Sequence, residues 1–136
     1  DPHLTPELFR LRLRPCRGEI KGVLTRQDCV AGIGNAYADE ILFRAGISPF
    51  CKRTRLSAAD MDHLYRAMRQ VLQEAIDTLR QRVGDNIEVE VRDFLQVHRR
   101  GGQPCPRCGA PISELQANQR ITSFCRRCQP GTLVRN

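Results

Sequence analysis

Apolar residues recur at helical spacing through the first two thirds of the chain. The longest stripe begins after Ser57 and ends at Gly84. Its members stand three or four positions apart: Met61, Leu64, Met68, Val71, Leu72, Ala75, Ile76 and Leu79. Ser57 and Asp60 stand where the two partners of a capping box would, with Asp in place of the usual Glu. The pattern predicts one long amphipathic helix from Ser57 to about Gly84.

Two shorter helices are expected before it. The first starts with Thr5 as N-cap and Pro6 at the first helical position. It would place three leucines on one face: Leu4, Leu8 and Leu11. A second short helix is expected from Glu19 to about Gln27 and would turn three residues inward: Ile20, Val23 and Leu24.

A glycine-rich turn, Gly32-Ile33-Gly34-Asn35, feeds a further helix that ends at Gly46. With Asn35 as N-cap, such a turn brings backbone N–H groups and the positive end of the helix dipole to one point, where an anion can bind. Many helices begin this way and only cap themselves. The turn alone therefore leaves both interpretations open.

The pattern of apolar and polar residues changes after Gly84. Residues 87–91 alternate between apolar and acidic side chains, which predicts a strand, and residues 94–97 extend it or form a turn. We place a domain boundary near residue 88, giving parts 1–88 and 89–136. The second part is too short and polar to be held by hydrophobic burial alone.

Four cysteines supply the missing constraint. Cys105 and Cys108 form one C-x2-C pair, and Cys125 and Cys128 form another after sixteen intervening residues. This spacing is typical of a structural zinc site with four thiolate ligands and no open position. Residues 111–115 and 119–124 would form a hairpin that the metal clips. Two redox motifs are the alternative, but neither pair stands at a strand-to-helix junction.

Composition and net charge limit the class of partner that the chain is expected to bind. The chain has 136 residues with few aromatics, which favours a mainly α protein, and a formal net charge of +7, which suits a polyanion such as nucleic acid. Lys21 and Lys52 are the only lysines; the other basic residues are arginines, whose guanidinium matches phosphate, although genome composition or thermal adaptation also explains such a bias. Cys16, Cys29 and Cys51 are expected to be ordinary thiols. No signal peptide or membrane span is apparent, so we expect a cytoplasmic, nucleoid-associated protein.

Two segments together carry a specific resemblance. Residues 31–35 with Tyr37-Ala38-Asp39-Glu40 and 43–47 resemble the helix-two-turn-helix signature of the formamidopyrimidine-DNA glycosylase and endonuclease VIII family. Residues 104–105 and 119–129 are similar to that family's zinc finger. The resemblance implies a mainly α helix-two-turn-helix bundle followed by a small zinc-bound β-hairpin, from the DNA-binding part of a base-excision-repair glycosylase and AP lyase.

The resemblance also implies roles for individual residues. Asn35 matches an asparagine that bonds a phosphate flanking the lesion, with the Gly34 turn helping. Arg120 matches the arginine near the hairpin tip that grips phosphates and assists the last elimination step. Lys21 matches a basic residue that supports recognition of the damaged site, although by itself it would be interpreted as a solvated helix lysine. The implied partner is double-stranded DNA with an oxidised base or abasic site, bound by a monomer carrying one Zn²⁺.

The resemblance stops at the catalytic amine. In the family an N-terminal proline attacks the sugar and a neighbouring glutamate acts as acid, whereas here Pro2 follows Asp1 and its nitrogen is an amide. We expect this chain, lacking that catalytic N-terminal part, to be inactive by itself. A second departure is the short acidic stretch 84–90, where the formamidopyrimidine enzymes carry a glycine-rich loop, so recognition of an oxidised purine does not follow.

Other arginines and other functions remain open at this stage. Arg99, Arg100, Arg126 and Arg127 are candidates to widen the electrostatic footprint, though charge runs are commonly just solvated. One alternative function is a non-catalytic RNA- or ribosome-binding helix-two-turn-helix protein with a structural zinc ribbon, which would not need Arg120. Another is a zinc-ribbon module that binds protein.

Overall fold

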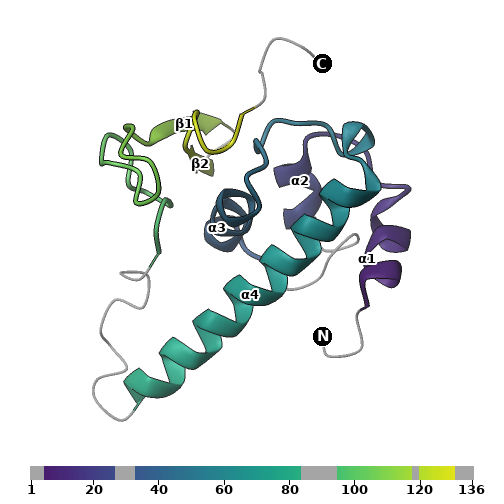
Figure 1. Ribbon diagram of the computed structural model, residues 1–136, viewed down its shortest axis with the longest axis horizontal. Helices are drawn as coiled ribbons and strands as arrows, with labels where there is room; N and C mark the ends of the chain where they lie inside the picture. The colour runs from purple at the N-terminus through teal and green to yellow at the C-terminus, as the bar shows by residue number, and fades with distance from the viewer. Residues whose placement is uncertain (1–4, 27–32, 84–94, 118–119, 131–136) are drawn as a thin grey trace.

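The computed structural model describes residues 5–26, 33–83, 95–117 and 120–130. Expectations for Leu4, Cys29, Gly32 and the predicted strand at 87–91 lie outside these residues, as does the predicted boundary near residue 88. The elements follow in this order: α1 (Pro6–Leu13), α2 (Ile20–Thr25), α3 (Asn35–Ala45), a 3-10 turn η1 (Arg53–Arg55), α4 (Ala58–Val83), β1 (Ser113–Ala117) and β2 (Arg120–Phe124). The mainly α class with one terminal hairpin is confirmed (Figure 1).

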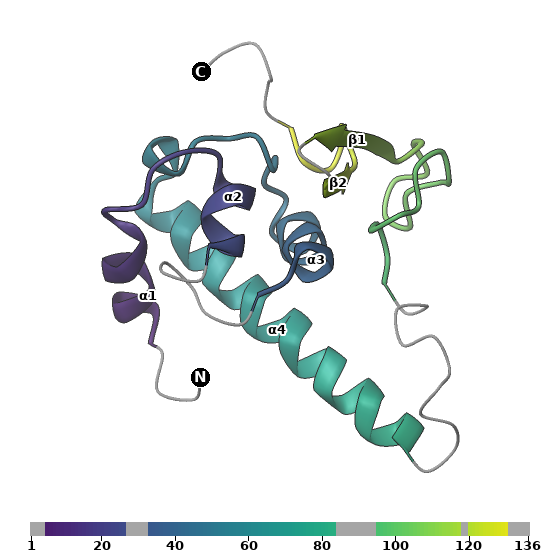
Figure 2. The ribbon, with the colours of Figure 1, turned by 180° about the vertical axis from the view of Figure 1, so that it is seen from behind.

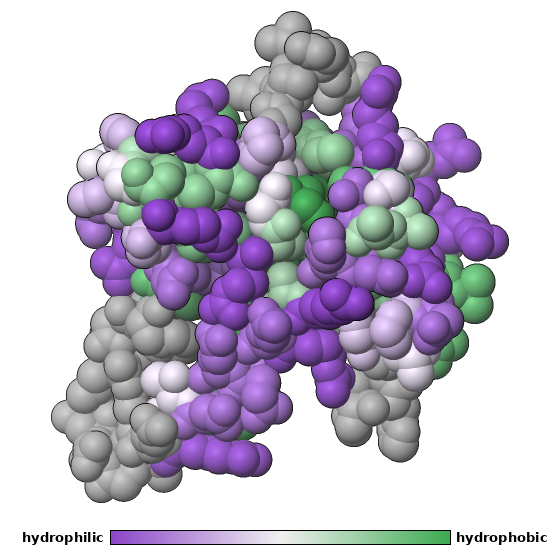
Figure 3. Space-filling view, viewed as in Figure 1, coloured by the Kyte–Doolittle hydropathy of each residue, from purple (hydrophilic) through white to green (hydrophobic). Residues whose placement is uncertain are grey.

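Helix α1 begins as predicted but buries a different face. The Thr5 hydroxyl accepts a hydrogen bond from the Leu8 amide, and Pro6 occupies the first turn. Phe9 and Leu13, four positions apart, are fully buried, whereas the leucine face is exposed (Leu8 43%, Leu11 57%). Figure 3 shows hydrophobic atoms at the surface over α1. The shared leucine face therefore lies toward solvent, and Phe9 is the residue that joins α1 to the core.

The start of α3 differs by one residue from the prediction. Gly34 is the N-cap, none of the described side chains caps the helix, and Asn35 is the first helical residue. The Asn35 amide instead donates to the Ile121 carbonyl of β2 at 2.9 Å. The other end is as expected, because Gly46 adopts the left-handed conformation (φ 73°) that terminates the helix.

Helix α4 carries the predicted capping box and most of the predicted stripe. The Ser57 amide donates to Asp60 and the Asp60 amide donates to the Ser57 hydroxyl, each at 3.0 Å. The stripe packs with α1, α2 and α3 in one core, in which Met61, Leu64, Met68 and Val71 are buried. Ile76 is 44% exposed, so the buried stripe weakens before the helix ends.

The hairpin forms where the sequence placed it, within two residues. Strands β1 and β2 are antiparallel, with Ser113 opposite Phe124 and Ala117 opposite Arg120. Arg120 thus stands at the tip of the hairpin. Residues 94–97, left open between strand and turn, are described from residue 95 on and form a turn in which Leu95 and Val97 are buried.

Helix α3 joins the two parts of the molecule. It packs against α4 on one side and against β2 on another, and Figures 1 and 2 show the hairpin beside α3 from both directions. Phe43 of α3 belongs to a second, smaller core with Val97, Cys105, Ile112 and Cys125. The position of the hairpin is therefore set by α3.

Candidate functional site

The four predicted metal ligands form one cluster. The sulfur atoms of Cys105, Cys108, Cys125 and Cys128 all lie within 4.8 Å of one another. Two of the separations are 3.8 Å (Cys105 to Cys128) and 3.5 Å (Cys108 to Cys125). A zinc tetrahedron with Zn–S bonds of about 2.3 Å has edges of about 3.8 Å. The geometry fits one structural zinc with four sulfur ligands and no position left for substrate.

The surroundings of the sulfurs also favour a cation. The backbone amides of Arg107 and Cys128 approach the sulfurs of Cys105 and Cys125 at 3.3 and 3.4 Å, as in a thiolate turn. Burial raises the pKa of the Cys105 thiol, but hydrogen bonds from the backbone amides of Cys108 and Arg107 and from the neighbouring Cys125 and Cys108 thiols outweigh it, leaving a pKa of about 7. Burial and the neighbouring thiols raise the pKa of Cys128 to about 12. Four thiolates therefore need a bound cation to share the site.

The cysteine cluster is tied to the end of α3. The Arg107 guanidinium lies 4.3 Å from the Phe43 ring centroid and donates to the Phe43 carbonyl at 3.1 Å. Gln129 is buried; its amide nitrogen donates to the Ile47 carbonyl, and its oxygen accepts from the Cys125 amide. The metal turn is thus fixed to the helical part by specific polar contacts.

Two consecutive carboxylates of α3 hold the rest of the second part. Glu40 accepts the backbone amides of Gln96, Val97 and His98 at 2.8 to 2.9 Å. Asp39 accepts the His98 imidazole at 2.7 Å and the Ser123 amide at 3.1 Å. Both carboxylates are buried, at 1% and 6% exposure. Buried charges need polar partners, and these contacts supply them for Glu40 and for one Asp39 oxygen, whereas the other Asp39 oxygen accepts no hydrogen bond from the described residues.

Lys21 completes this network. Its ammonium lies 2.9 Å from Asp39 and donates to the Ile121 carbonyl and the Thr122 hydroxyl, both at 2.8 Å. Lys21 is only 8% exposed, so its interpretation as a solvated helix lysine is wrong. Burial lowers the pKa of Lys21, and the Asp39 carboxylate opposes that shift.

Asn35 and Arg120 meet at the same strand. Asn35 shares the Ile121 carbonyl with Lys21, and Arg120 is the preceding residue. The Arg120 guanidinium donates to the Thr25 hydroxyl of α2 at 3.2 Å. Lys21, Asn35 and Arg120, which are up to 99 positions apart in sequence, therefore converge on the start of β2, as the sequence required.

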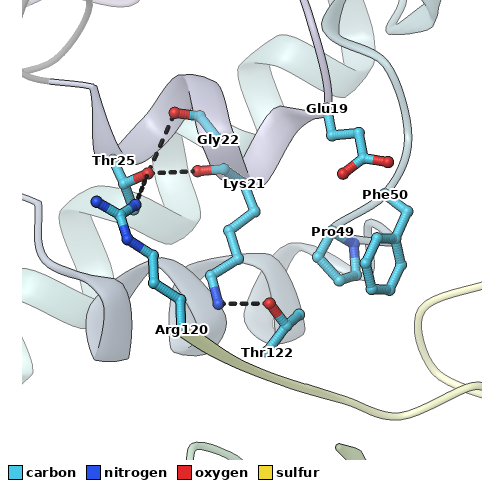
Figure 4. A pocket seen from close by; sticks show the side chains of 8 residues that line it. All are labelled: Glu19, Lys21, Gly22, Thr25, Pro49, Phe50, Arg120 and Thr122. Carbon is cyan, nitrogen blue, oxygen red and sulfur yellow. Dashed lines mark hydrogen bonds between the residues drawn. The ribbon is translucent and has the colours of Figure 1, made fainter. Parts of the chain in front are cut away.

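An open cavity of about 380 Å³ lies against this junction. Figure 4 shows Lys21 and Arg120 side by side on one wall, with Thr25 and Thr122 next to them. Pro49 and Phe50 form an apolar wall, and Glu19 completes the rim. The cavity is thus lined by two cations and two hydroxyls, of which Arg120 is the exposed cation.

The other arginines make mixed contributions. Arg100 donates to the Leu95 carbonyl, and Arg126 donates to the Ser113 hydroxyl while lying over the Phe124 ring. These two side chains support the second part from within. Arg99 and Arg127 are exposed, and a wider footprint from them stays a prediction.

Sequence reasoning missed the residues that dock the two parts. Asp39 and Glu40 were noted only as part of a signature, and His98 and Gln129 were not singled out. The available signal was two adjacent acids flanked by apolar residues, Ala38 before them and Ile41 after them, in the middle of a helix. The prediction that Cys16 is an ordinary thiol is also wrong, because Cys16 is disulfide-bonded.

Comparisons with known proteins agree with this geometry. The H2TH domain of formamidopyrimidine-DNA glycosylase matches residues 1–86, and a zinc finger found in FPG and IleRS matches residues 102–131. The formamidopyrimidine-DNA glycosylase of Symbiobacterium thermophilum is 41% identical over 135 residues, covering 96% of this chain and 44% of that protein. An uncharacterized formamidopyrimidine-DNA glycosylase-like protein of Mycobacterium tuberculosis is 44% identical over 117 residues, covering 84% and 72%.

Solved structures match equally well. The Lactococcus lactis Fpg in complex with abasic-site DNA has a TM-score of 0.80 at 33% identity, covering 93% of this chain and 48% of that one. A MutM complex with DNA containing carbocyclic 8-oxo-G has a TM-score of 0.79 at 35% identity, covering 93% and 47%.

The chain matches only part of the length of most of these relatives. The chain spans about half the length of most of the curated relatives it matches. Among the described residues no helix is long and apolar enough to cross a membrane. The matched helical domain, the matched zinc finger and the cysteine tetrad lead to one assignment: the chain belongs to the formamidopyrimidine-DNA glycosylase family, of which it carries the helix-two-turn-helix region and the structural zinc finger.

Proposed function

We propose that this chain is the DNA-binding part of a base-excision-repair glycosylase and AP lyase that acts on oxidised bases. It holds duplex DNA with an oxidised base or an abasic site through the sugar-phosphate backbone. The relatives' structures were solved with abasic-site DNA and with 8-oxo-G DNA, which supports this class of ligand. The observation that carries the proposal is the convergence of Asn35 and Arg120, from two parts of the chain, on the start of β2.

The N-terminus of α3 supplies the first phosphate contact. Within the described ranges no side chain caps this 11-residue helix, which favours an external acceptor for its first amides. Gly34 has a φ of −88° and a side chain there would meet nothing, so the chain itself does not demand glycine. A phosphate does, because it needs close approach to the amides. The Asn35 amide nitrogen gives one hydrogen to Ile121 and retains the other for the same phosphate.

Arg120 supplies the second contact from the hairpin tip. Its side chain is exposed and has one described partner, the Thr25 hydroxyl, so most of its five donors remain for a phosphate. Burial is the main cause that lowers the pKa of Lys21, and the Asp39 carboxylate raises it. Arg120 lowers this pKa further, because the two cations repel each other. An anion between α2 and β2 relieves that repulsion. The proposal includes a supporting role for Arg120 in an elimination step at the lesion.

Catalysis requires more than this chain's described residues provide. The family's chemistry uses a proline amine, and Pro2 here is joined to Asp1 through an amide. We expect the chain alone to bind damaged duplex without excising a base or nicking an abasic strand. Borohydride reduction in the presence of abasic DNA should leave no covalent adduct; a trapped adduct would contradict this.

The expected location and oligomeric state follow from the proposed DNA ligand. A protein that grips chromosomal DNA acts where the chromosome is, so a cytoplasmic, nucleoid-associated location belongs to the proposal. One chain presents a complete zinc site and a complete phosphate site, so we expect binding as a monomer.

The proposal is tested with three probes in fluorescence anisotropy: an abasic-site duplex, the same duplex intact, and a structured RNA. Tighter binding to the abasic duplex supports the repair function. Equal or tighter binding to RNA favours the RNA-binding alternative, and no binding to any of the three favours a protein-binding zinc module.

A further inference from the structure

The buried network behind the cavity assigns a specific task to Lys21. An ammonium group has three N–H donors. In this structure the ammonium donates hydrogen bonds to the Ile121 carbonyl and the Thr122 hydroxyl, and it forms an ion pair with the Asp39 carboxylate at 2.9 Å. A phosphate would therefore have to displace Lys21 from partners that it already has within the chain. Its low exposure points the same way.

Asp39 is the centre of the network. One of its oxygens faces Lys21, and the other accepts both the His98 imidazole and the Ser123 amide. It thus joins α3 to α2, to the turn at 95–98 and to β2. The contact to Ser123 lies three residues from Arg120, so movement of this carboxylate shifts the strand that presents the arginine.

We propose that Lys21 and Asp39 are positioning residues for DNA binding, and that neither contacts the DNA. Together they fix β2 against α2 and α3 at the register that places Arg120 beside Asn35. This deepens the proposed function and rests on it for the DNA readouts.

Variants that keep or remove the charge of Lys21 distinguish this proposal from the alternative, in which Lys21 binds a phosphate directly. If Lys21 were a phosphate ligand, Lys21→Arg would keep the charge and much of the affinity, and Lys21→Met would reduce the slope of log K against log salt by about 0.9. If the pair positions β2, Lys21→Arg weakens binding, because a planar guanidinium cannot meet three acceptors arranged around one ammonium nitrogen. Lys21→Met then weakens binding with little change in slope.

For Asp39→Asn, electrostatics alone and the positioning role predict opposite changes in DNA affinity. Removing a negative charge near a phosphate site strengthens DNA binding through electrostatics alone. A positioning role predicts weaker binding, on the order of tenfold, because the amide cannot hold Lys21 and Ser123 as the carboxylate does. Exposed Asp77 of α4 is the matched control, and Asp77→Asn should bind at least as tightly as the unmodified chain.

The experiment measures affinity for the abasic duplex over a salt series, together with zinc content and helical signal, for Asp39→Asn, Lys21→Arg and Lys21→Met. Weaker binding by all three with an unchanged slope supports the proposal. Wild-type or tighter binding by Asp39→Asn, or wild-type affinity in Lys21→Arg, overturns it. If Asp39→Asn loses zinc or helical signal, the two lysine variants decide.

A measurement without DNA keeps the proposal separate from the proposed function. The Ser123 amide donates to Asp39, so its hydrogen exchange in the free chain reports the position of β2. We expect faster exchange at Ser123 in Lys21→Met, which does not touch that bond directly. Unchanged exchange there contradicts the positioning role even if the chain binds no DNA.

Discussion

The helical bundle and the zinc hairpin are held together by different forces. The bundle buries a continuous apolar core in which Phe9, Leu42 and Leu64 are fully inaccessible. The hairpin part has a small apolar cluster, two of whose members are cysteines of the tetrad, and it docks on α3 through the Asp39 and Glu40 carboxylates. Apolar burial is non-directional, whereas a hydrogen bond constrains both the distance and the angle between the groups that it joins.

This difference suits the two tasks. A bundle provides stability, and a small metal-braced hairpin can present one arginine at a defined place. The proposed phosphate-binding surface lies where the two meet, at the Ile121 carbonyl, which accepts hydrogen bonds from both α2 and α3. The comparison therefore predicts that the helical bundle and the zinc hairpin can each lose their structure while the other stays folded.

Zinc removal should have the largest effect. Structural zinc sites contribute roughly 10 kcal/mol or more of folding free energy to small fingers. Chelation, or Cys125→Ser, should release the hairpin and abolish preference for the abasic duplex, while the far-ultraviolet helical signal persists because the bundle has its own core. Cys51→Ser is the control, since Cys51 lies outside the tetrad. Simultaneous loss of helical signal and zinc would show that the parts are not separate.

Leu64→Ala tests the other half of the comparison. Leu64 is fully buried in the bundle, so truncation should cost about 2 to 5 kcal/mol of unfolding free energy in a denaturant titration. Zinc content should stay at one per chain. Leu115 of β1 is 39% exposed, and Leu115→Ala should cost under about 0.5 kcal/mol. Similar losses in the two variants would contradict the placement of the core.

The smallest effect concerns the ion pair between α3 and α4. Arg44 donates to both oxygens of Glu74, at 2.7 and 3.0 Å, and these bonds lower the pKa of Glu74 below its ordinary 4.5. A depressed folded-state pKa stabilises the fold above the unfolded pKa and loses that stabilisation as pH falls through the folded value. Since the Glu74 side chain is 59% exposed, the contribution should be about 0.2 to 1 kcal/mol. Unfolding curves of Glu74→Gln should lie below wild type at neutral pH and converge with it in acid.

Much of the fold was predictable because it depends on local pattern. The capping box at Ser57, the terminator at Gly46 and the cysteine spacing each act over a few residues, and all three are confirmed. The exposed face of α1 was not predictable, since Phe9 and the leucines offer similar hydrophobicity and tertiary packing chose between them. Asn35 was expected to cap its own helix, but a carbonyl 86 residues away took its amide.

The docking residues escaped prediction for the same reason. Nothing in the neighbourhood of Asp39 shows that His98 and Ser123 will be its partners, because those contacts span 59 and 84 residues. The structure brings together Lys21, Asn35 and Arg120, which the resemblance named, but the buried position of Lys21 became visible only from its contacts with Ile121, Thr122 and Asp39.

The most direct test of the account is the salt dependence of binding to an abasic duplex for wild type, Asn35→Ala, Arg120→Ala and Arg66→Gln, an exposed arginine of α4 outside the cavity. We predict that Arg120→Ala reduces the slope of log K against log salt by about 0.9, because one phosphate contact is lost. Asn35→Ala should weaken binding with little change in slope, since its amide is neutral, and Arg66→Gln should match wild type. A slope for Arg120→Ala equal to that of wild type would contradict the claim that the hairpin tip and the start of α3 grip one DNA backbone.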